Sequence, residues 1–312
     1  MRRSLAGAAL SVLVASGVLA DEAFVTNQSS EDVSIIDLVT GETRATGAVG
    51  GKPAGIAVSP DGAFAYVVSP ESKTVSVVDA AAAKVVRRIV LDGGPLGIAV
   101  HPDGRTLYVA DWYEARIHVV DAKSGKTTGI VEVGESPSGL AITPDGALLL
   151  SADRDSNRVS MIDTINLRRV ATIPAGDRPF GITIHEGRAY VAGVRSNTVF
   201  VIDIARREDV DVIAVGERPY AIAFAGGRGF VTDQYADTVT VFDVETREVI
   251  GKIDVGEYPE GIDVTSDGAR VVVANWFSNT VSVIDAQTLE VVAEHETGDG
   301  PRAFGRFIRA TE

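Results

Sequence analysis

The sequence contains no cysteine. This absence excludes a disulfide framework, a thiolate nucleophile and any metal or cluster site with cysteine ligands. The fold must therefore be stabilised by packing and hydrogen bonding alone.

Basic residues are scarce, with 29 Lys and Arg against 43 Asp and Glu and a net charge of −14. Proteins that bind nucleic acids without sequence preference need a basic surface that displaces counterions from the phosphates. Anionic membrane surfaces attract basic segments for a similar electrostatic reason. We therefore expect no nucleic-acid partner and no role at a membrane surface.

Long apolar stretches are absent apart from residues 5–19, which follow two arginines. Val18 and Ala20 occupy the −3 and −1 positions typical of a signal-peptidase site. A membrane anchor is the alternative, but this run is shorter than the roughly 20 residues that a spanning helix needs. We expect a signal peptide over residues 1–20, cleaved after Ala20, and a periplasmic or secreted domain over residues 21–312 with no membrane span.

Two motifs recur along this domain. The first resembles VSVID and ends at an aspartate, and its copies are spaced by 40 or 42 residues. Its seven copies end at Asp37, Asp79, Asp121, Asp163, Asp203, Asp243 and Asp285. The second resembles RPFGITI and keeps the same step from Pro53 to Pro301. Both motifs therefore indicate seven repeats.

One repeat, Pro95 to Ser136, contains the short runs GIAV, TLYVAD, IHVVD and TTGIVEV. Each run is bounded by Gly, Pro or Asp, and none has helical periodicity, so the repeat predicts a four-stranded antiparallel meander with strands A to D. Turn sequences such as HPDG connect strands A and B. The aspartates that end strand C are interpreted as caps of the following turn rather than as a ring of functional carboxylates.

Seven such sheets predict an all-β, seven-bladed β-propeller. Residues from about 23 to 49 supply strands B to D without a preceding strand A, whereas PRAFGRFI near the C-terminus is a strand A without its partners. We expect the two ends to share one blade, because this closes the ring and removes the free sheet edges.

The motifs LYVAD, AFVTN, NTVSVID and GIAVSPDG resemble the YVTN family of seven-bladed propellers, exported bacterial type. The resemblance covers nearly all of residues 21–312 and implies the fold. It leaves function open, because the family includes surface-layer proteins, exported propellers of unknown role, relatives found near quinoprotein oxidation systems and more distant lactonase and lyase propellers. An accessory role in periplasmic oxidation is one function that it implies.

The B-to-C and D-to-A loops lie at the same end of a propeller, and here they carry bulky residues. The candidate binding residues are Trp112, Tyr113, Arg116, Arg178, Phe180, Arg195, Arg218, Tyr220, Tyr235, Tyr258, Glu260, Trp276, Phe277 and Arg302. Exposed aromatics interleaved with arginine are typical of binding surfaces. Alternatively, the aromatics cover the blade tops and the arginines pair locally. We expect Arg178, Arg218 and Arg302, with Phe180 and Tyr220, to form an anion-preferring rim around the axial funnel.

The four histidines are dispersed over two A-to-B turns, one strand C and one strand D. Because histidine is the usual metal ligand and general base, we expect no metal, no cofactor and no histidine-based catalysis. Glu260 beside Arg302 is either an acid/base group or half of an ion pair between blades.

Two functions therefore compete. The first is a monomeric, non-enzymatic, exported propeller whose B-to-C and D-to-A loops bind a periplasmic protein or a small anionic ligand. The alternative is a lactonase-like or lyase-like enzyme with its site in the axial funnel.

Overall fold

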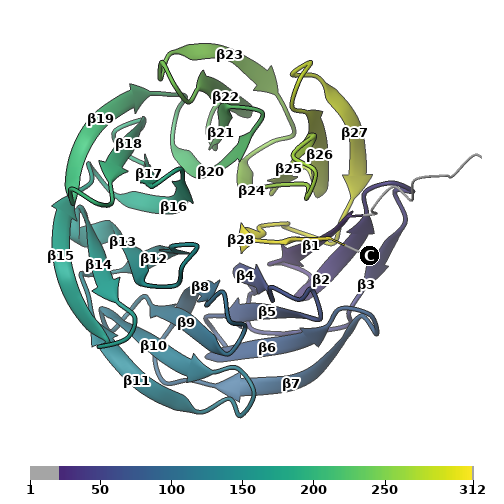
Figure 1. Ribbon diagram of the computed structural model, residues 1–312. Coiled ribbons are helices and arrows are strands. Elements are labelled where there is room, and N and C mark those ends of the chain that lie inside the picture. Colours follow the sequence, from purple (N-terminus) through teal and green to yellow (C-terminus); the bar gives the residue numbers. More distant parts are fainter. Residues whose placement is uncertain (1–20, 311–312) are drawn as a thin grey trace, which may run out of the picture.

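A computed structural model describes residues 21–310 as seven sheets arranged in a ring around a central axis (Figure 1). The predicted signal peptide lies outside these described residues. Within each blade the strands A to D are antiparallel, which confirms the predicted all-β, seven-bladed propeller. Helix is confined in the described part of the chain to one 3₁₀ turn, η1 (Arg154–Ser156), so no helix there is long and apolar enough to cross a membrane.

The first two blades involve both ends of the chain. Blade 1 contains β1 (Asp21–Asn27), β2 (Asp32–Asp37), β3 (Thr43–Ala45) and the C-terminal β29 (Ile308–Ala310). Blade 2 contains β4 (Gly55–Val58), β5 (Phe64–Ser69), β6 (Thr74–Asp79) and β7 (Lys84–Val90), with β28 (Phe304–Arg306) added beside β4.

The remaining blades are each continuous in sequence. Blade 3 contains β8 (Pro95–Val100), β9 (Thr106–Asp111), β10 (Arg116–Asp121) and β11 (Thr127–Glu132); blade 4 contains β12 (Pro137–Ile142), β13 (Leu148–Asp153), β14 (Arg158–Asp163) and β15 (Arg168–Pro174). Blade 5 contains β16 (Pro179–His185), β17 (Arg188–Gly193), β18 (Thr198–Asp203) and β19 (Glu208–Ala214). Blade 6 contains β20 (Pro219–Ala225), β21 (Arg228–Asp233), β22 (Thr238–Asp243) and β23 (Val249–Asp254); blade 7 contains β24 (Pro259–Val264), β25 (Arg270–Asn275), β26 (Thr280–Asp285) and β27 (Val291–Glu296).

The hydrophobic core lies between neighbouring blades. Strands B and C are buried on both faces, as in β25 and β26, whereas the outer strand β7 alternates between exposed and partly buried residues. One apolar cluster joins Ile35 of blade 1, Val67 of blade 2 and Val283 of blade 7 across the point where the ring closes. A single blade could not bury both of its faces, so the seven blades depend on one another for stability.

The aspartates that end strand C cap the next turn, as predicted. In blade 7, Asp285 Oδ1 accepts hydrogen bonds from the backbone N–H groups of Gln287 and Thr288, at 2.9 and 2.8 Å. Asp37 makes the same pair of contacts in blade 1. These carboxylates are therefore structural.

Ring closure differs in one detail from the prediction. The segment PRAFGRFI was expected to be one strand A of the shared blade, but it divides between two blades. Its β28 runs parallel to β4, and β29 then pairs with β1 in the antiparallel sense. Gly305 permits this path, because its φ is +124° and a Cβ atom there would lie 2.3 Å from the carbonyl oxygen of Ile56.

Candidate functional site

The propeller has two distinct ends. We call the end with the B-to-C and D-to-A connections the loop face, and the end with the A-to-B and C-to-D connections the turn face. Backbone hydrogen bonds join each B-to-C loop to the preceding D-to-A loop, as in Trp112 N to Gly94 O at 2.9 Å and Trp276 N to Tyr258 O at 3.0 Å. The loops that carry the candidate residues therefore share the loop face, as their order in the repeat predicted.

Four aromatic rings form a continuous group on the loop face over blades 6 and 7, which we call the aromatic cluster: Tyr235, Tyr258, Trp276 and Phe277. The centroid of the Tyr258 ring lies 5.6, 5.8 and 5.0 Å from those of Tyr235, Trp276 and Phe277. Tyr235 and Phe277 are 50% and 59% exposed. Trp276 is half-buried, and its indole Nε1 lies against Gly300. Trp276 therefore supports the cluster from below, while Phe277 and Tyr235 present its surface.

Arginines extend this surface toward blade 4. The guanidinium of Arg218 lies 4.3 Å from the centre of the Tyr235 ring and donates a hydrogen bond of 3.1 Å to its hydroxyl. Burial lowers the pKa of Arg154, and the positive charges of Arg178 and Arg218 add to this effect against the opposing charge of Asp155. Arg154 pairs with Asp155 at 2.9 Å, but it also experiences the positive charges of Arg178 and Arg218, and a negative partner group near these residues would be attracted by them.

Four of the candidate residues near the axis are buried or half-buried. Phe180 and Tyr220 are 6% and 5% exposed, and their rings lie 4.3 Å apart. Arg302 Nε lies 2.7 Å from Glu260 Oε2, and Arg302 Nη2 donates to the Tyr220 hydroxyl at 2.6 Å. Gln234 Nε2 donates to the other Glu260 oxygen at 2.8 Å. We call this group the axial plug, and it includes Phe304, whose ring centroid lies 4.8 Å from that of Phe180.

The axial plug changes how Arg302 and Glu260 are interpreted. Burial raises the pKa of Glu260, whereas the positive charge of Arg302 opposes the shift. Burial also raises the pKa of Tyr220. Of the two expectations for Glu260 and Arg302, the structure shows the ion pair between neighbouring parts of the ring. Of the predicted anion-binding rim, Arg178 and Arg218 are half-buried, and Arg302 is paired with Glu260.

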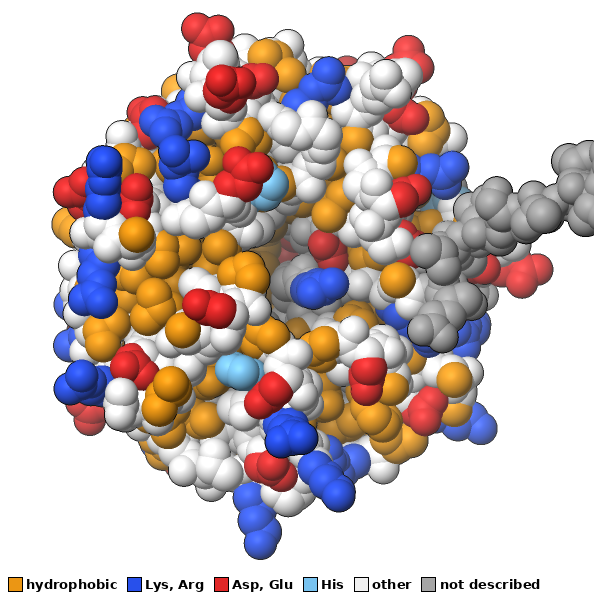
Figure 2. All heavy atoms as spheres, in the orientation of Figure 1, with side chains coloured by type: hydrophobic (Ala, Val, Ile, Leu, Met, Phe, Trp, Pro, Cys, Tyr) orange, Lys and Arg blue, Asp and Glu red, His pale blue; other side chains and the backbone are white. Residues whose placement is uncertain are grey.

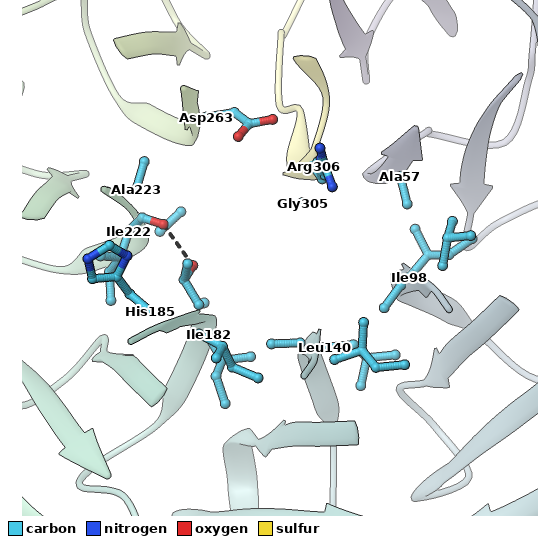
Figure 3. Close-up of a pocket in the computed structure, with 18 of the residues that line it drawn as sticks. Ala57, Ile98, Leu140, Ile182, His185, Ile222, Ala223, Asp263, Gly305 and Arg306 are labelled. Carbon is cyan, nitrogen blue, oxygen red and sulfur yellow. Dashed lines mark hydrogen bonds between the residues drawn. The ribbon is translucent and has the colours of Figure 1, made fainter. Parts of the chain in front are cut away.

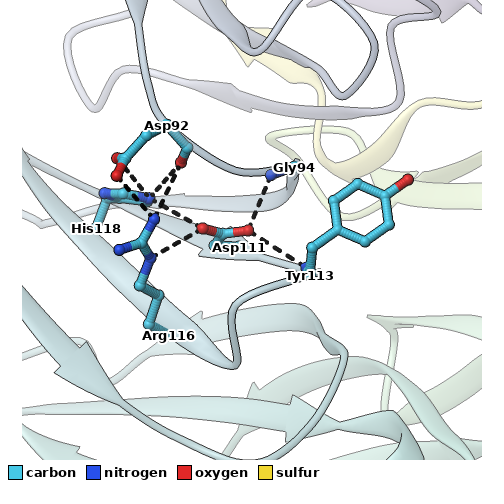
Figure 4. A network of polar contacts seen from close by, with 6 residues as sticks. All are labelled: Asp92, Gly94, Asp111, Tyr113, Arg116 and His118. Carbon is cyan, nitrogen blue, oxygen red and sulfur yellow. Dashed lines mark hydrogen bonds and ion pairs between the residues drawn. The ribbon is translucent and has the colours of Figure 1, made fainter.

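Arg116 and Tyr113 of blade 3 have opposite orientations (Figure 4). Asp111, which is fully buried, accepts hydrogen bonds from Arg116 Nε at 2.9 Å and from the backbone N–H of Gly94 at 2.8 Å. His118 Nε2 lies 3.3 Å from the same carboxylate. Arg116 therefore stabilises the blade, whereas the Tyr113 ring points away from this network and is 72% exposed.

The two remaining candidate binding residues are Trp112 and Arg195. Trp112 is half-buried, with the Arg154 guanidinium 5.4 Å from its ring centre and the Phe180 ring 6.4 Å away. Arg195 is exposed and lies 3.6 Å from a carboxylate oxygen of Asp177. The local pairing expected as an alternative is thus present at Arg116, Arg195 and Arg302.

Comparison with known proteins supports the same architecture. The family model "Lactonase, 7-bladed beta-propeller" matches residues 55–170, which contain blades 2 and 3 and most of blade 4. The chain is a seven-bladed β-propeller, and residues 55–170 resemble this lactonase family. No curated protein sequence matches it.

Three solved structures resemble this propeller. A Kuenenia stuttgartiensis hydrazine synthase chain has a TM-score of 0.74 and 22% identity, with 80% of this chain and 88% of that chain covered. A functionally unknown protein from Desulfotomaculum acetoxidans has a TM-score of 0.75 and 15% identity, covering 91% and 99%. The dihydro-heme d1 dehydrogenase NirN has a TM-score of 0.69 and 17% identity, covering 93% and 75%. At these identities the likeness is one of fold.

The turn face of the propeller holds an axial cavity of about 600 Å³ that the sequence did not lead us to expect (Figure 2). Its wall consists mainly of aliphatic side chains from strand A of successive blades. Figure 3 places Asp263, His185 and Arg306 around the same space. The histidines were expected to lie away from the axial funnel of the loop face, but His185 lines this second cavity.

The repeat itself contains the signal that identifies Asp263 and Arg306. The fourth residue after the motif proline is Ala in four repeats but Thr183, Asp263 and Gly305 in the others. The fifth residue is apolar in six repeats and Arg306 in the seventh. Sequence reasoning therefore missed that a polar or charged residue replaces an apolar one at these two repeat positions.

Within residues 21–310 no group of three or more His, Asp or Glu side chains is arranged to hold a metal ion.

Proposed function

We propose that this chain is an exported, periplasmic or secreted propeller that binds a protein partner through the aromatic cluster of its loop face. The observation that carries the proposal is the continuity of four aromatic rings on two neighbouring blades, with Tyr235 and Phe277 each at least half exposed. Aromatic side chains provide large contact areas at a low entropy cost and dominate the binding energy of many interfaces.

The charge distribution favours a partner with acidic groups. The chain has a net charge of −14, yet the guanidinium of Arg218 lies over Tyr235 of the aromatic cluster, and the positive charges of Arg178 and Arg218 both act on Arg154. Electrostatic complementarity raises association rates and excludes wrong partners, and arginine binds carboxylates through two parallel hydrogen bonds. A partner that places Asp or Glu side chains next to an apolar patch would match this surface.

Affinity capture tests the proposal. The full chain and a Tyr235→Ser, Phe277→Ser variant are immobilised, exposed to the periplasmic fraction of the source cells, and compared by mass spectrometry. Ile165→Ser is the matched control, because Ile165 is 85% exposed but lies on the turn face. We expect one partner to be retained by the wild type and the control and lost by the double variant. Equal capture by all three proteins would refute the proposal.

A lactonase activity is the second candidate, because residues 55–170 match a family with that name. Ring opening of a lactone needs a general base or an activated water near the substrate carbonyl. The carboxylate of the axial plug, Glu260, is 5% exposed and held by Arg302 and Gln234. Proton release from glucono-lactone and from a γ-lactone would measure this activity, and turnover abolished by Glu260→Gln would favour the enzyme.

A further inference from the structure

We infer that the turn-face cavity binds a small organic monoanion with an apolar body, such as a medium-chain carboxylate, with Arg306 as its anion-binding group. This site lies at the end of the propeller opposite to the aromatic cluster, and it does not depend on the proposed function. Four features of the cavity carry the inference: its size, its lining, its charge and the position of Arg306.

The size and the lining suit a ligand with an apolar body. The cavity of about 600 Å³ falls within the range of known small-molecule sites. Its lining is aliphatic in most blades, with Ile98, Leu140, Ile182 and Ile222 contributed by four successive ones. Phe304 belongs both to this lining and to the axial plug, so the plug lies at the inner end of the cavity. Such walls exclude water from a bound chain or ring and strengthen any ionic contact inside.

The polar side chains of the cavity are mostly occupied by the protein. Asp263 Oδ2 accepts hydrogen bonds from the backbone N–H groups of Phe307 and Ile308 at 2.8 and 2.9 Å. The Thr183 hydroxyl donates to the carbonyl oxygen of Ile222 at 2.7 Å. His185 stacks on Phe224, with ring centroids 4.3 Å apart and planes at 5°. These groups are therefore committed to the fold.

Arg306 is the exception. Its side chain is exposed at the cavity, and it makes no ion pair within 4.0 Å and no side-chain hydrogen bond to any residue between 21 and 310. Burial raises the pKa of Asp263, and the positive charge of Arg306 opposes this shift. The Asp263 carboxylate nevertheless accepts hydrogen bonds from backbone N–H groups and does not pair directly with Arg306. A guanidinium at an apolar cavity is suited to bind a carboxylate through two hydrogen bonds.

The remaining charges limit the ligand to one negative charge. Arg306 is the single Lys or Arg among the described residues that line the cavity, and Asp263 lies near it on the same side of the cavity (Figure 3). The chain as a whole has a net charge of −14. A second negative charge on the ligand would meet Asp263 and the acidic field of the protein without a cation to compensate it. A monocarboxylate is therefore favoured over a dicarboxylate or a phosphate.

Isothermal titration calorimetry of the full chain with three eight-carbon probes tests this inference. Octanoate, 1-octanol and octanedioate share the chain length but carry one, no and two negative charges. We expect octanoate to bind at least about tenfold more tightly than 1-octanol, since a hydrogen bond to a charged group is worth about tenfold or more in affinity. We expect the same minimum difference from octanedioate, because no cation in the cavity compensates its second negative charge. No octanoate binding, or equal binding of octanol, would overturn the inference.

Three variants locate the binding site. Arg306→Gln should lower octanoate affinity at least about tenfold with an unchanged melting temperature. Arg105→Gln is the matched control, because Arg105 is an exposed arginine on the turn face that does not line the cavity. Phe277→Ser, on the loop face, should bind octanoate normally, which separates this site from the partner surface. Unchanged affinity in Arg306→Gln would refute the assignment.

Discussion

Arg302 Nε lies 2.7 Å from Glu260 Oε2 in the buried axial plug, where the strand that closes the ring meets blade 7. The side chains of Arg302 and Glu260 are only 19% and 6% exposed. This ion pair therefore joins the C-terminal segment to the inner strand of its neighbour. Its role is structural in the first instance, although both residues looked like binding residues in the sequence.

Breaking this pair should destabilise the propeller. Arg302→Met leaves the Glu260 carboxylate buried without its partner, so we expect a loss of about 3–5 kcal/mol in the free energy of unfolding. The Arg302→Met, Glu260→Met double variant should recover most of that loss, because the second change removes the unpaired charge. Urea unfolding of the three proteins measures both values, and a single variant as stable as the wild type would contradict the prediction.

Deleting residues 301–312 should cost far more stability than the length of the segment suggests. The deletion removes β28 and β29 together with Phe304, Phe307 and Ile308, which are 5%, 0% and 6% exposed. At about 1.5–3 kcal/mol for each buried side chain, we expect a loss of about 5 kcal/mol or more. Thermal melts test this, with Arg306→Gln as the control that keeps the strand. Equal melting temperatures of the truncated and intact proteins would disprove closure by a shared blade.

Trp276 and Phe277 should respond differently to removal, although they are adjacent. Phe277→Ser removes an exposed ring, so its effect on the free energy of unfolding should stay within about 0.5 kcal/mol. Trp276→Ser removes a half-buried ring against Gly300 and should cost about 2 kcal/mol. Melting curves of the two single variants, compared with their partner capture, separate packing from binding. Equal destabilisation by both changes would show that the aromatic cluster is only a packing feature.

The aspartates that end strand B should respond differently to pH. Burial raises the pKa of Asp153 despite hydrogen bonds from Ser160 and Ser151. Asp111 is also subject to burial, but hydrogen bonds from Gly94 and Arg116 outweigh it and lower its pKa. The contribution of Asp111 to stability is therefore complete above the unfolded pKa of about 3.9, and it is lost as the pH falls through the pKa of the folded protein. Asp153 depends on pH in the opposite way: its contribution is complete below about 3.9 and is lost as the pH rises through the pKa of the folded protein.

Two matched substitutions test this difference. Asp153→Asn should raise the melting temperature at pH 7, and the gain should shrink below about pH 4, where the unfolded carboxyl is also protonated. Asparagine is already present at the equivalent positions Asn27 and Asn275. Asp111→Asn should lower stability at pH 7 by about 1.5–3 kcal/mol, since it removes the negative partner of Arg116. The same sign for both variants would contradict the assignment.

The repeats made most of the fold predictable. The repeats combine short strands with turns rich in Gly, Asp and Pro, so the local preferences and the spacing of 40 or 42 residues agree. The division of the C-terminal segment between β28 and β29 was not predictable, because it depends on how the closing strand meets Ile56 across the ring.

The candidate site was harder to predict, because depth along the axis has no local signature. Phe180 and Tyr235 both looked like loop-face aromatics, yet the first is 6% and the second 50% exposed. Arg116 resembled a binding residue until its contact with Asp111 was seen. By contrast, Arg306 could have been found from the sequence, because it replaces an apolar residue at a position shared by all seven repeats.

The most direct test of partner binding by the loop face is photo-crosslinking in the source cells. A photo-crosslinking amino acid is incorporated at Phe277, at Tyr235 or, as the turn-face control, at Ile165, and adducts are identified after irradiation. The account predicts one discrete adduct with the same protein from positions 277 and 235 and none from position 165. Adducts from position 165 alone, or no adduct from either loop-face position, would contradict it.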